Sequence, residues 1–482
     1  MTVAEGLVND PDSGALALPV YLSTGDSQRY VEFAKYDGER GIVPFDAYKT
    51  SFTDVDATSI VKLSYSPSLA AGTETRVGGI CYAQGARDKY IELGKGAVLK
   101  VGNGRDPAAI HFGVCNSLRG GDGTLDFGGS EGIFTIPTSH QGYPNSIGVK
   151  LAGTAGVSYF CFNRDHDQKV AIGNANVYTG GTRIWGVDVY ANNAGAFSSG
   201  DVHVGRGWCR GGRVILNVEN AVFANNFHLA GRGNSHQTDS DNLGRLYVNY
   251  RKGALSFAKN ATVSGNVILE ESTRITAADG VTGVISGVVS GDRLEIYKPF
   301  TSYDAGVVKL AGSNTYTGGT DVVQSTLSLG GGSGAGTGAV TLDNGVLQFE
   351  NEAAVTFAND VKGAGRVRLA GAAVDFTGDL SKLSAPLELV GGARYEFSSV
   401  PPFSTITNLD SRRAEVTLKS PGVYDLSNCA FDGKIRLILE DGARIDLGGG
   451  VLNVYQFLGN PAAVDGTVKP AVPCLGTVMI IR

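Results

Sequence analysis

The chain has 482 residues, a formal net charge of −6, 69 glycines, 15 prolines and 18% charged residues. Its hydrophobic content of 42% is too high for an intrinsically disordered chain, and its few prolines exclude a collagen-like polymer. Lysine and arginine form no run longer than two residues, so the sequence lacks the basic stripe that nucleic-acid binding requires.

The first 75 residues mix polar and aromatic side chains, as in Phe33 to Phe45, and we expect them to form a cap or irregular first coils. The first 20 residues lack the basic start and apolar run of a signal peptide. No run approaches the roughly 18 apolar residues of a membrane helix. If the protein is exported, we expect its signal and any anchor to lie outside this chain.

Short strand-like segments recur along the rest of the chain, and no amphipathic helical pattern of 12 residues accompanies them. Most have four to six residues with alternating apolar side chains, which is typical of strands. Gly-Gly, Asp-Gly and Asn-Gly pairs separate them and permit sharp turns. The pattern predicts an all-β fold with strands such as 90–93, 123–127, 213–218, 345–349 and 434–439.

One internal repeat stands out. Asn176 to Thr182 reads Asn-Val-Tyr-Thr-Gly-Gly-Thr, and Asn314 to Thr320 reads Asn-Thr-Tyr-Thr-Gly-Gly-Thr. The match continues without a gap, so that Val189 corresponds to Leu327, Gly200 to Gly338 and Val204 to Leu342. A repeat that contains a strand, a glycine turn and another strand indicates a fold built by stacking one unit many times.

A second motif follows each copy of this repeat. Phe223-Ala-Asn-Asn226 corresponds to Phe357-Ala-Asn-Asp360, with a weaker version at Phe257 to Asn260. An antiparallel sandwich also has short strands and turns, but the repeated unit spans several strands without an obvious hairpin. We therefore predict a single-stranded parallel β-helix, a solenoid, over residues 76–399. Coils of roughly 20–25 residues would give about 20 coils, with residues 400–482 as degenerate terminal coils.

The segment from Leu310 to Leu342 resembles the autotransporter-associated β-strand repeat, also called the passenger-associated transport repeat. Its Leu-Ala-Gly-Ser-Asn-Thr-Tyr-Thr-Gly-Gly-Thr start carries the resemblance, and residues 173–204 form a second copy with substitutions. The resemblance implies a right-handed parallel β-helix on an exported bacterial protein, surface-displayed or secreted, in which the repeat serves transport and folding. No terminal barrel follows in this chain, and its six cysteines exceed what such passengers usually carry.

Two polar runs are candidate ligand-binding segments. Residues 163–167 and 232–242 contain Asp and His residues that suit a metal or an acid–base pair, and loops on a solenoid often carry binding. The simpler interpretation of both runs is a solvated turn or insertion. The candidate residues are Asp165, His166, Asp167, His236, Asp239 and Asp241.

Other residue types suggest less. His203 and His228 alternate with apolar residues, which favours a packing role over a ligand role. The six cysteines form no CxxC pair and act either as buried thiols or as bridges between coils. Exposed aromatic residues could stack on sugars, although inward packing is as compatible, at Trp185, Tyr190, Trp208 and Tyr297. We identify no catalytic motif, and we expect no cofactor and no bound metal.

These observations favour a non-enzymatic passenger segment at the bacterial cell surface or in the extracellular medium, acting as a stalk or adhesin. Glycans or host surface components are its expected partners. The alternative is a polysaccharide-degrading lyase or glycosidase on the same scaffold, which the fold alone does not establish. A viral tail fibre is a third class and would be trimeric. The sequence leaves the oligomeric state open.

Overall fold

The computed structural model describes residues 32–136, 144–161, 168–205, 211–233, 252–298, 306–330, 334–391, 394–397 and 403–472. In these residues the chain is an all-β, parallel β-solenoid of about 17 turns, as predicted. The helical element among them is the short 3₁₀ helix η1 (Pro461–Ala463). None of the described helical residues forms a segment with the length and apolarity to span a membrane. The chain divides into two compact units, at Val281 and Thr282.

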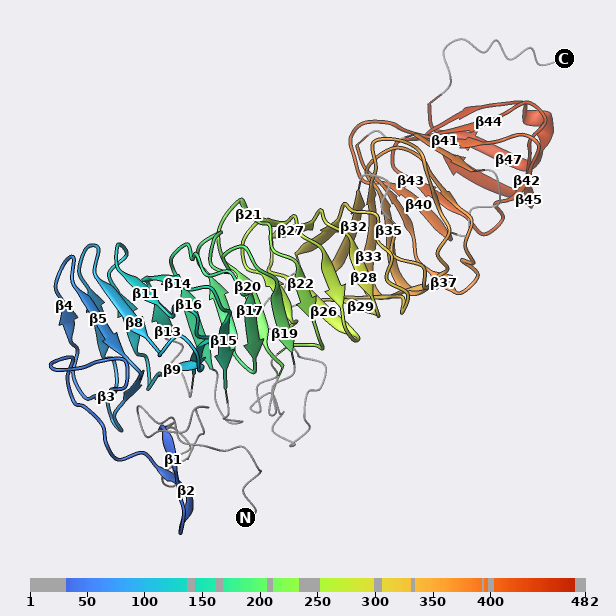
Figure 1. Ribbon diagram of the computed structural model, residues 1–482. Coiled ribbons are helices and arrows are strands. Elements are labelled where there is room, and N and C mark those ends of the chain that lie inside the picture. The colour runs from blue at the N-terminus through green and yellow to red at the C-terminus, as the bar shows by residue number, and fades with distance from the viewer. Residues whose placement is uncertain are drawn as a thin grey trace. The chain divides into compact units, whose positions relative to one another are not determined.

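Three parallel sheets wind through the first unit (Figure 1), because each coil contributes one strand to each sheet. Sheet 1 contains β3 (Ile60–Leu63), β6 (Gly79–Tyr82), β9 (Ala108–His111), β12 (Gly132–Thr135), β15 (Val157–Phe160), β17 (Thr182–Trp185), β19 (Val202–Gly205), β22 (Phe227–Leu229) and β25 (Val267–Leu269). Sheet 2 contains β4 (Ser68–Leu69), β7 (Tyr90–Leu93), β10 (Ser117–Arg119), β13 (Asn145–Ile147), β16 (Lys169–Ile172), β18 (Asp188–Ala191), β20 (Arg213–Leu216), β23 (Leu255–Phe257) and β26 (Thr273–Ala277).

The third sheet of this unit is shorter. It contains β5 (Glu74–Val77), β8 (Val98–Val101), β11 (Thr124–Asp126) and β14 (Lys150–Ala152), and later coils place β21 (Ala221–Phe223) beside β24 (Ala261–Val263). Before the first coil, β1 (Ala34–Asp37) and β2 (Gly41–Pro44) form an antiparallel hairpin. The other described strand pairs of the unit are parallel, which excludes the sandwich alternative.

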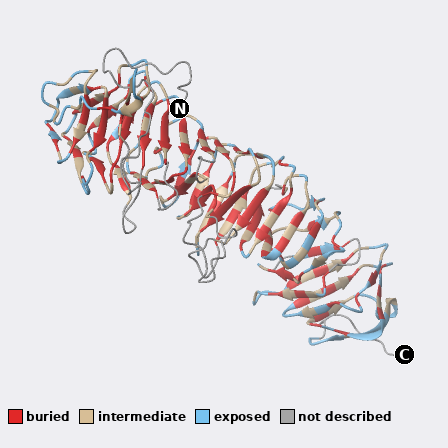
Figure 2. Cartoon of the chain, turned by 90° about the horizontal axis from the view of Figure 1, so that it is seen from below, coloured by how far each residue is buried: buried red, intermediate tan, exposed pale blue. Residues whose placement is uncertain are grey.

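The core of the first unit consists of apolar side chains stacked in register from coil to coil. On sheet 1 one inward row runs Ile110, Phe134, Tyr159, Ile184 and Val204, each fully or almost fully buried. The Phe134 and Tyr159 rings stack with centroids 5.4 Å apart. Each such burial stabilises the fold by about 1.5–3 kcal/mol. Figure 2 shows the same arrangement, with buried residues concentrated on the strands and exposed residues on the turns.

The second unit continues the same strand–turn pattern. It contains β27 (Thr282–Ile285), β28 (Val289–Gly291), β29 (Leu294–Tyr297), β30 (Val307–Leu310), β31 (Thr320–Val323), β32 (Thr326–Gly330), β33 (Val340–Glu350), β34 (Val355–Phe357), β35 (Val361–Leu369), β36 (Val374–Phe376), β37 (Leu383–Ser384), β38 (Leu387–Leu389), β39 (Arg394–Phe397), β40 (Thr405–Asn408), β41 (Ala414–Leu418), β42 (Val423–Asp425), β43 (Ala430–Asp432), β44 (Ile435–Leu439), β45 (Arg444–Val454), β46 (Gln456–Leu458) and β47 (Val464–Pro470). Its long strands β33 and β35 pair in parallel along most of their length.

The two copies of the sequence repeat fold alike. Tyr178 is fully buried and its hydroxyl lies 2.5 Å from the Thr182 hydroxyl, whereas the Tyr316 and Thr320 hydroxyls lie 2.7 Å apart. In both copies the asparagine side chain bridges neighbouring coils. Asn176 accepts from the Leu151 N–H and donates to the Ala196 carbonyl, and Asn314 does the same with Val289 and Gly334. The repeat therefore encodes one turn of the solenoid.

The second motif is also structural. Asn225 donates to the Ser198 and Gly200 carbonyls of the preceding coil, and Asn359 donates to the Gly336 and Gly338 carbonyls. These side chains satisfy turn carbonyls that no strand partner reaches, which is the asparagine ladder the sequence predicted.

Four described cysteines are free thiols, at Cys81, Cys115, Cys161 and Cys429. Three of them are buried, at Cys81, Cys161 and Cys429. The buried-thiol interpretation is thus confirmed at these three positions. Cys209 and Cys474 lie outside the described residues.

Candidate functional site

The six candidate residues from the sequence, Asp165, His166, Asp167, His236, Asp239 and Asp241, all lie outside the described residues. The described strands beside them give one piece of information. Residues 162–167 follow β15 and residues 234–251 follow β22, and both strands belong to sheet 1. Because the carboxyl ends of parallel strands meet at one edge of a sheet, both segments start from the same edge, roughly 14 Å apart over three strand spacings.

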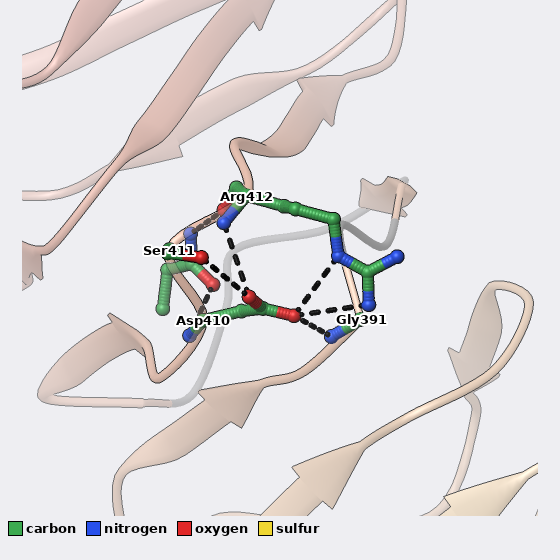
Figure 3. Close-up of polar contacts among 5 residues, drawn as sticks. Gly391, Asp410, Ser411 and Arg412 are labelled. Carbon is green, nitrogen blue, oxygen red and sulfur yellow. Dashed lines mark hydrogen bonds and ion pairs between the residues drawn. The ribbon is translucent and has the colours of Figure 1, made fainter.

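Carboxylates in the described turns of the second unit serve the fold. Figure 3 shows Asp410, whose carboxylate accepts hydrogen bonds from the Gly391 N–H at 3.2 Å and from the Arg412 side chain at 3.1 and 3.2 Å. The Arg412 backbone N–H also donates to it, and this bond is the main reason that the pKa of Asp410 is lowered. Asp410 thereby ties its own turn to the turn of the preceding coil.

Charged residues on the strands of the second unit pair across coils. Arg368 contacts Glu388 at 2.7 Å, and Arg436 contacts Glu415 at 3.0 Å. The two residues of each pair are register partners on adjacent strands. Opposite charges in this position stabilise sheet pairing modestly, so these groups have structural roles.

The outer face of sheet 1 carries a different arrangement. His203 on β19 and His228 on β22 are register partners, and their imidazole rings stack with centroids 4.3 Å apart. Both lie between buried residues of their strands, so they point away from the core. Asp201 precedes β19, and its carboxylate lies 3.7 Å from His228 Nε2. Ligand atoms of Asp201, His203 and His228 all lie within 4.8 Å of one another.

Neighbouring residues orient this cluster. Glu270, which follows β25, lies 3.3 Å from His228 Nδ1, on the opposite side of the ring from Asp201. Asn226 donates to Asp201 Oδ1 at 3.0 Å, and its own amide oxygen accepts from the Asn266 N–H. Since Asn266 fixes which end of the Asn226 amide faces Asp201, the Asp201 carboxylate is held with Oδ2 toward His228.

The electrostatics favour neutral His203. Burial lowers the pKa of His203, and the neighbouring His228 and Arg183 act in the same direction, whereas Glu270 and Asp201 oppose them. Arg183 precedes His203 in the same register row and contacts Glu131 at 3.4 Å. A neutral imidazole retains a lone pair that can accept a proton or bind a metal.

An aromatic pair lies two residues further along the same face. Trp185 on β17 is the register partner of Phe160 on β15, and their rings meet edge to face with centroids 4.6 Å apart. A Cβ at Gly205 would lie 2.7 Å from Trp185 Nε1, so the indole covers this glycine of the next strand. Both aromatic residues are partly exposed, and they form a platform beside the histidine pair.

Sequence reasoning assigned His203 and His228 to packing and overlooked Asp201 and Glu270. One signal was present, because residues 203 and 228 are separated by one coil length. Comparison of the chain with protein-family models, with curated proteins and with solved structures yields no match.

Proposed function

We propose that this chain is a β-helical passenger segment of an exported bacterial surface or secreted protein, and that it acts as a stalk or adhesin. The use of the repeat's polar residues carries this proposal. Asn176, Tyr178 and Thr182 form hydrogen bonds within and between coils, and their counterparts in the second copy do the same. A repeat whose polar groups hold coils together builds length and rigidity, which are the properties of a stalk.

Recognition belongs to the surface that this scaffold holds in place. The partly exposed Trp185–Phe160 platform suits stacking against the apolar face of a sugar ring. The segments that follow β15 and β22 start from the same edge of sheet 1. Glycans or glycosylated host surfaces are therefore the partners we propose.

The second candidate function is polysaccharide cleavage. It draws support from Asp201, His203 and Arg183, which bring a carboxylate, an imidazole and a guanidinium to the same face as Trp185. Carboxylate and imidazole groups can act as general acid and base. This function requires chain cleavage, which binding alone does not produce.

One experiment separates the two functions. The purified chain would be incubated with acidic and neutral polysaccharides, with and without calcium, while new chain ends and binding to the immobilised polymers are both measured. We expect no new chain ends, and binding to a subset of polymers that weakens when Trp185 is replaced by alanine. Release that is lost in Asp201→Ala, Asp165→Ala or Asp239→Ala would overturn the stalk or adhesin proposal and locate the catalytic site.

A further inference from the structure

The cluster on the outer face of sheet 1 combines two imidazoles and one carboxylate, contributed by two adjacent coils. Imidazole and carboxylate groups are the ligands of divalent transition metals such as Zn²⁺, whereas Ca²⁺ and Mg²⁺ prefer oxygen ligands alone. Three protein ligands with a remaining open position are typical of zinc sites that also bind a further molecule. The side chain of His228 is 25% exposed and that of Asp201 is 48% exposed, so solvent reaches the cluster.

We propose that Asp201, His203 and His228 bind a divalent transition-metal ion of the Zn²⁺ class at the outer face of sheet 1. This site is independent of the stalk or adhesin function proposed above.

Distances within the cluster are compatible with this site. Two ligand atoms of a tetrahedral zinc ion lie roughly 3.3 Å apart, since each lies about 2.0–2.1 Å from the metal. Asp201 Oδ2 and His228 Nε2 are 3.7 Å apart, and no pair of ligand atoms in the cluster exceeds 4.8 Å. Rotation of the two stacked rings about their side-chain bonds closes the remaining gap, and both rings lie on the solvent side of the sheet.

The surrounding contacts strengthen the assignment. Metal-binding histidines usually direct their second ring nitrogen to a carboxylate, which fixes the tautomer and the orientation of the ring. Glu270 occupies this position at His228 Nδ1, which leaves Nε2 on the side of Asp201. Asn226 orients the Asp201 carboxylate in the same way. A histidine ladder that served packing alone would not need a carboxylate on each side of one ring.

The test is metal binding by the full chain. Zn²⁺ binding would be measured by titration calorimetry, and Co²⁺ binding by its visible absorption spectrum, which reports nitrogen ligation. The variants are Asp201→Asn, His203→Gln, His228→Gln, the double histidine variant and Glu270→Gln. Glu219→Gln is the matched control, because Glu219 is an exposed carboxylate that accepts from Asn260 across coils.

We expect one tight Zn²⁺ site per chain, with no competition from Ca²⁺. Glu270→Gln should weaken binding about 10–100-fold, the single ligand variants should weaken it further, and Glu219→Gln should leave it unchanged. Zn²⁺ should raise the Tm of the wild-type chain and not that of the double histidine variant. Circular dichroism without metal checks that each variant is folded. Wild-type affinity in the folded double variant, or no tight site in the wild-type chain, would overturn the proposal.

Discussion

Tyr178 and Tyr316 carry their hydroxyls into the interior of the solenoid, where each meets a threonine hydroxyl four residues later. Burial raises the pKa of both tyrosines. A buried hydroxyl without a partner costs about 1–3 kcal/mol, so the threonine in Thr-Gly-Gly-Thr is as much a requirement of the fold as the tyrosine. At the scale of single residues, the repeat conserves hydrogen-bond partners across its two copies.

His111 offers a test of burial at this scale. It is 1% exposed, its Nδ1 lies 2.8 Å from the Thr135 hydroxyl, and burial lowers its pKa to about 3 from an ordinary value of 6.5. The unfolded chain therefore takes up a proton below pH 6.5 that the folded chain does not, so stability falls as the pH falls from 6.5 toward 3. At pH 4.5 we expect His111 to reduce the free energy of unfolding by ~2–3 kcal/mol relative to pH 7.5.

Urea unfolding at both pH values, for the wild-type chain and for His111→Gln, measures this contribution. The substitution removes the titrating group and keeps a polar side chain beside Thr135. The pH-dependent loss of stability should be smaller in the variant by the amount given above. Equal losses in the two proteins would show that His111 does not titrate as its burial requires.

At the scale of strands and turns, glycine determines how closely two coils approach. Gly200 and Gly338 are equivalent positions of the repeat, and each lies against a glycine of the preceding turn. A Cβ at Gly338 would lie 2.5 Å from the Gly319 nitrogen, and a Cβ at Gly200 would lie 2.5 Å from the Gly181 Cα. Gly181 and Gly319 have φ values of +82° and +83°, which few residues other than glycine adopt. The Gly-Gly pair of the repeat thus serves both turn geometry and coil spacing.

Gly338→Ala tests this close approach. Backbone atoms cannot yield as a long side chain can, so we expect the substitution to lower the free energy of unfolding by ~2–4 kcal/mol. Gly121→Ala is the control, because a Cβ there meets nothing within 4 Å, and it should change stability by less than ~1 kcal/mol. Urea unfolding of both variants gives the comparison. Similar effects of the two substitutions would contradict a steric role for Gly338.

At the scale of the whole molecule, each unit is a series of coils that contact chiefly their neighbours along the solenoid. In sheet 1, for example, β17 pairs with β15 and β19, and β22 pairs with β19 and β25. Such a chain is stabilised by local interfaces between coils and not by one central core. A local defect should therefore have local consequences.

Asn359→Ala provides the measurement. The substitution removes two hydrogen bonds to the Gly336 and Gly338 carbonyls, at 3.0 and 2.7 Å. In hydrogen exchange of backbone amides, we expect protection to fall in β31, β33 and β35 and to stay unchanged in β44 of the same unit. A uniform loss of protection across the unit would show that its coils unfold as one cooperative block.

The sequence by itself determined the strand alternation, the glycine turns and the repeat, and these were sufficient to predict a parallel solenoid. Each of these features depends on residues close together in the chain, so local physical chemistry encodes it. Only the tertiary structure decided which outward residues of different coils meet. His203 and His228 meet because their coil has 25 residues, whereas the next coil places Ile268 beside His228 after 40. Register between coils depends on the length of each connection, and alternation within a strand carries no information about it.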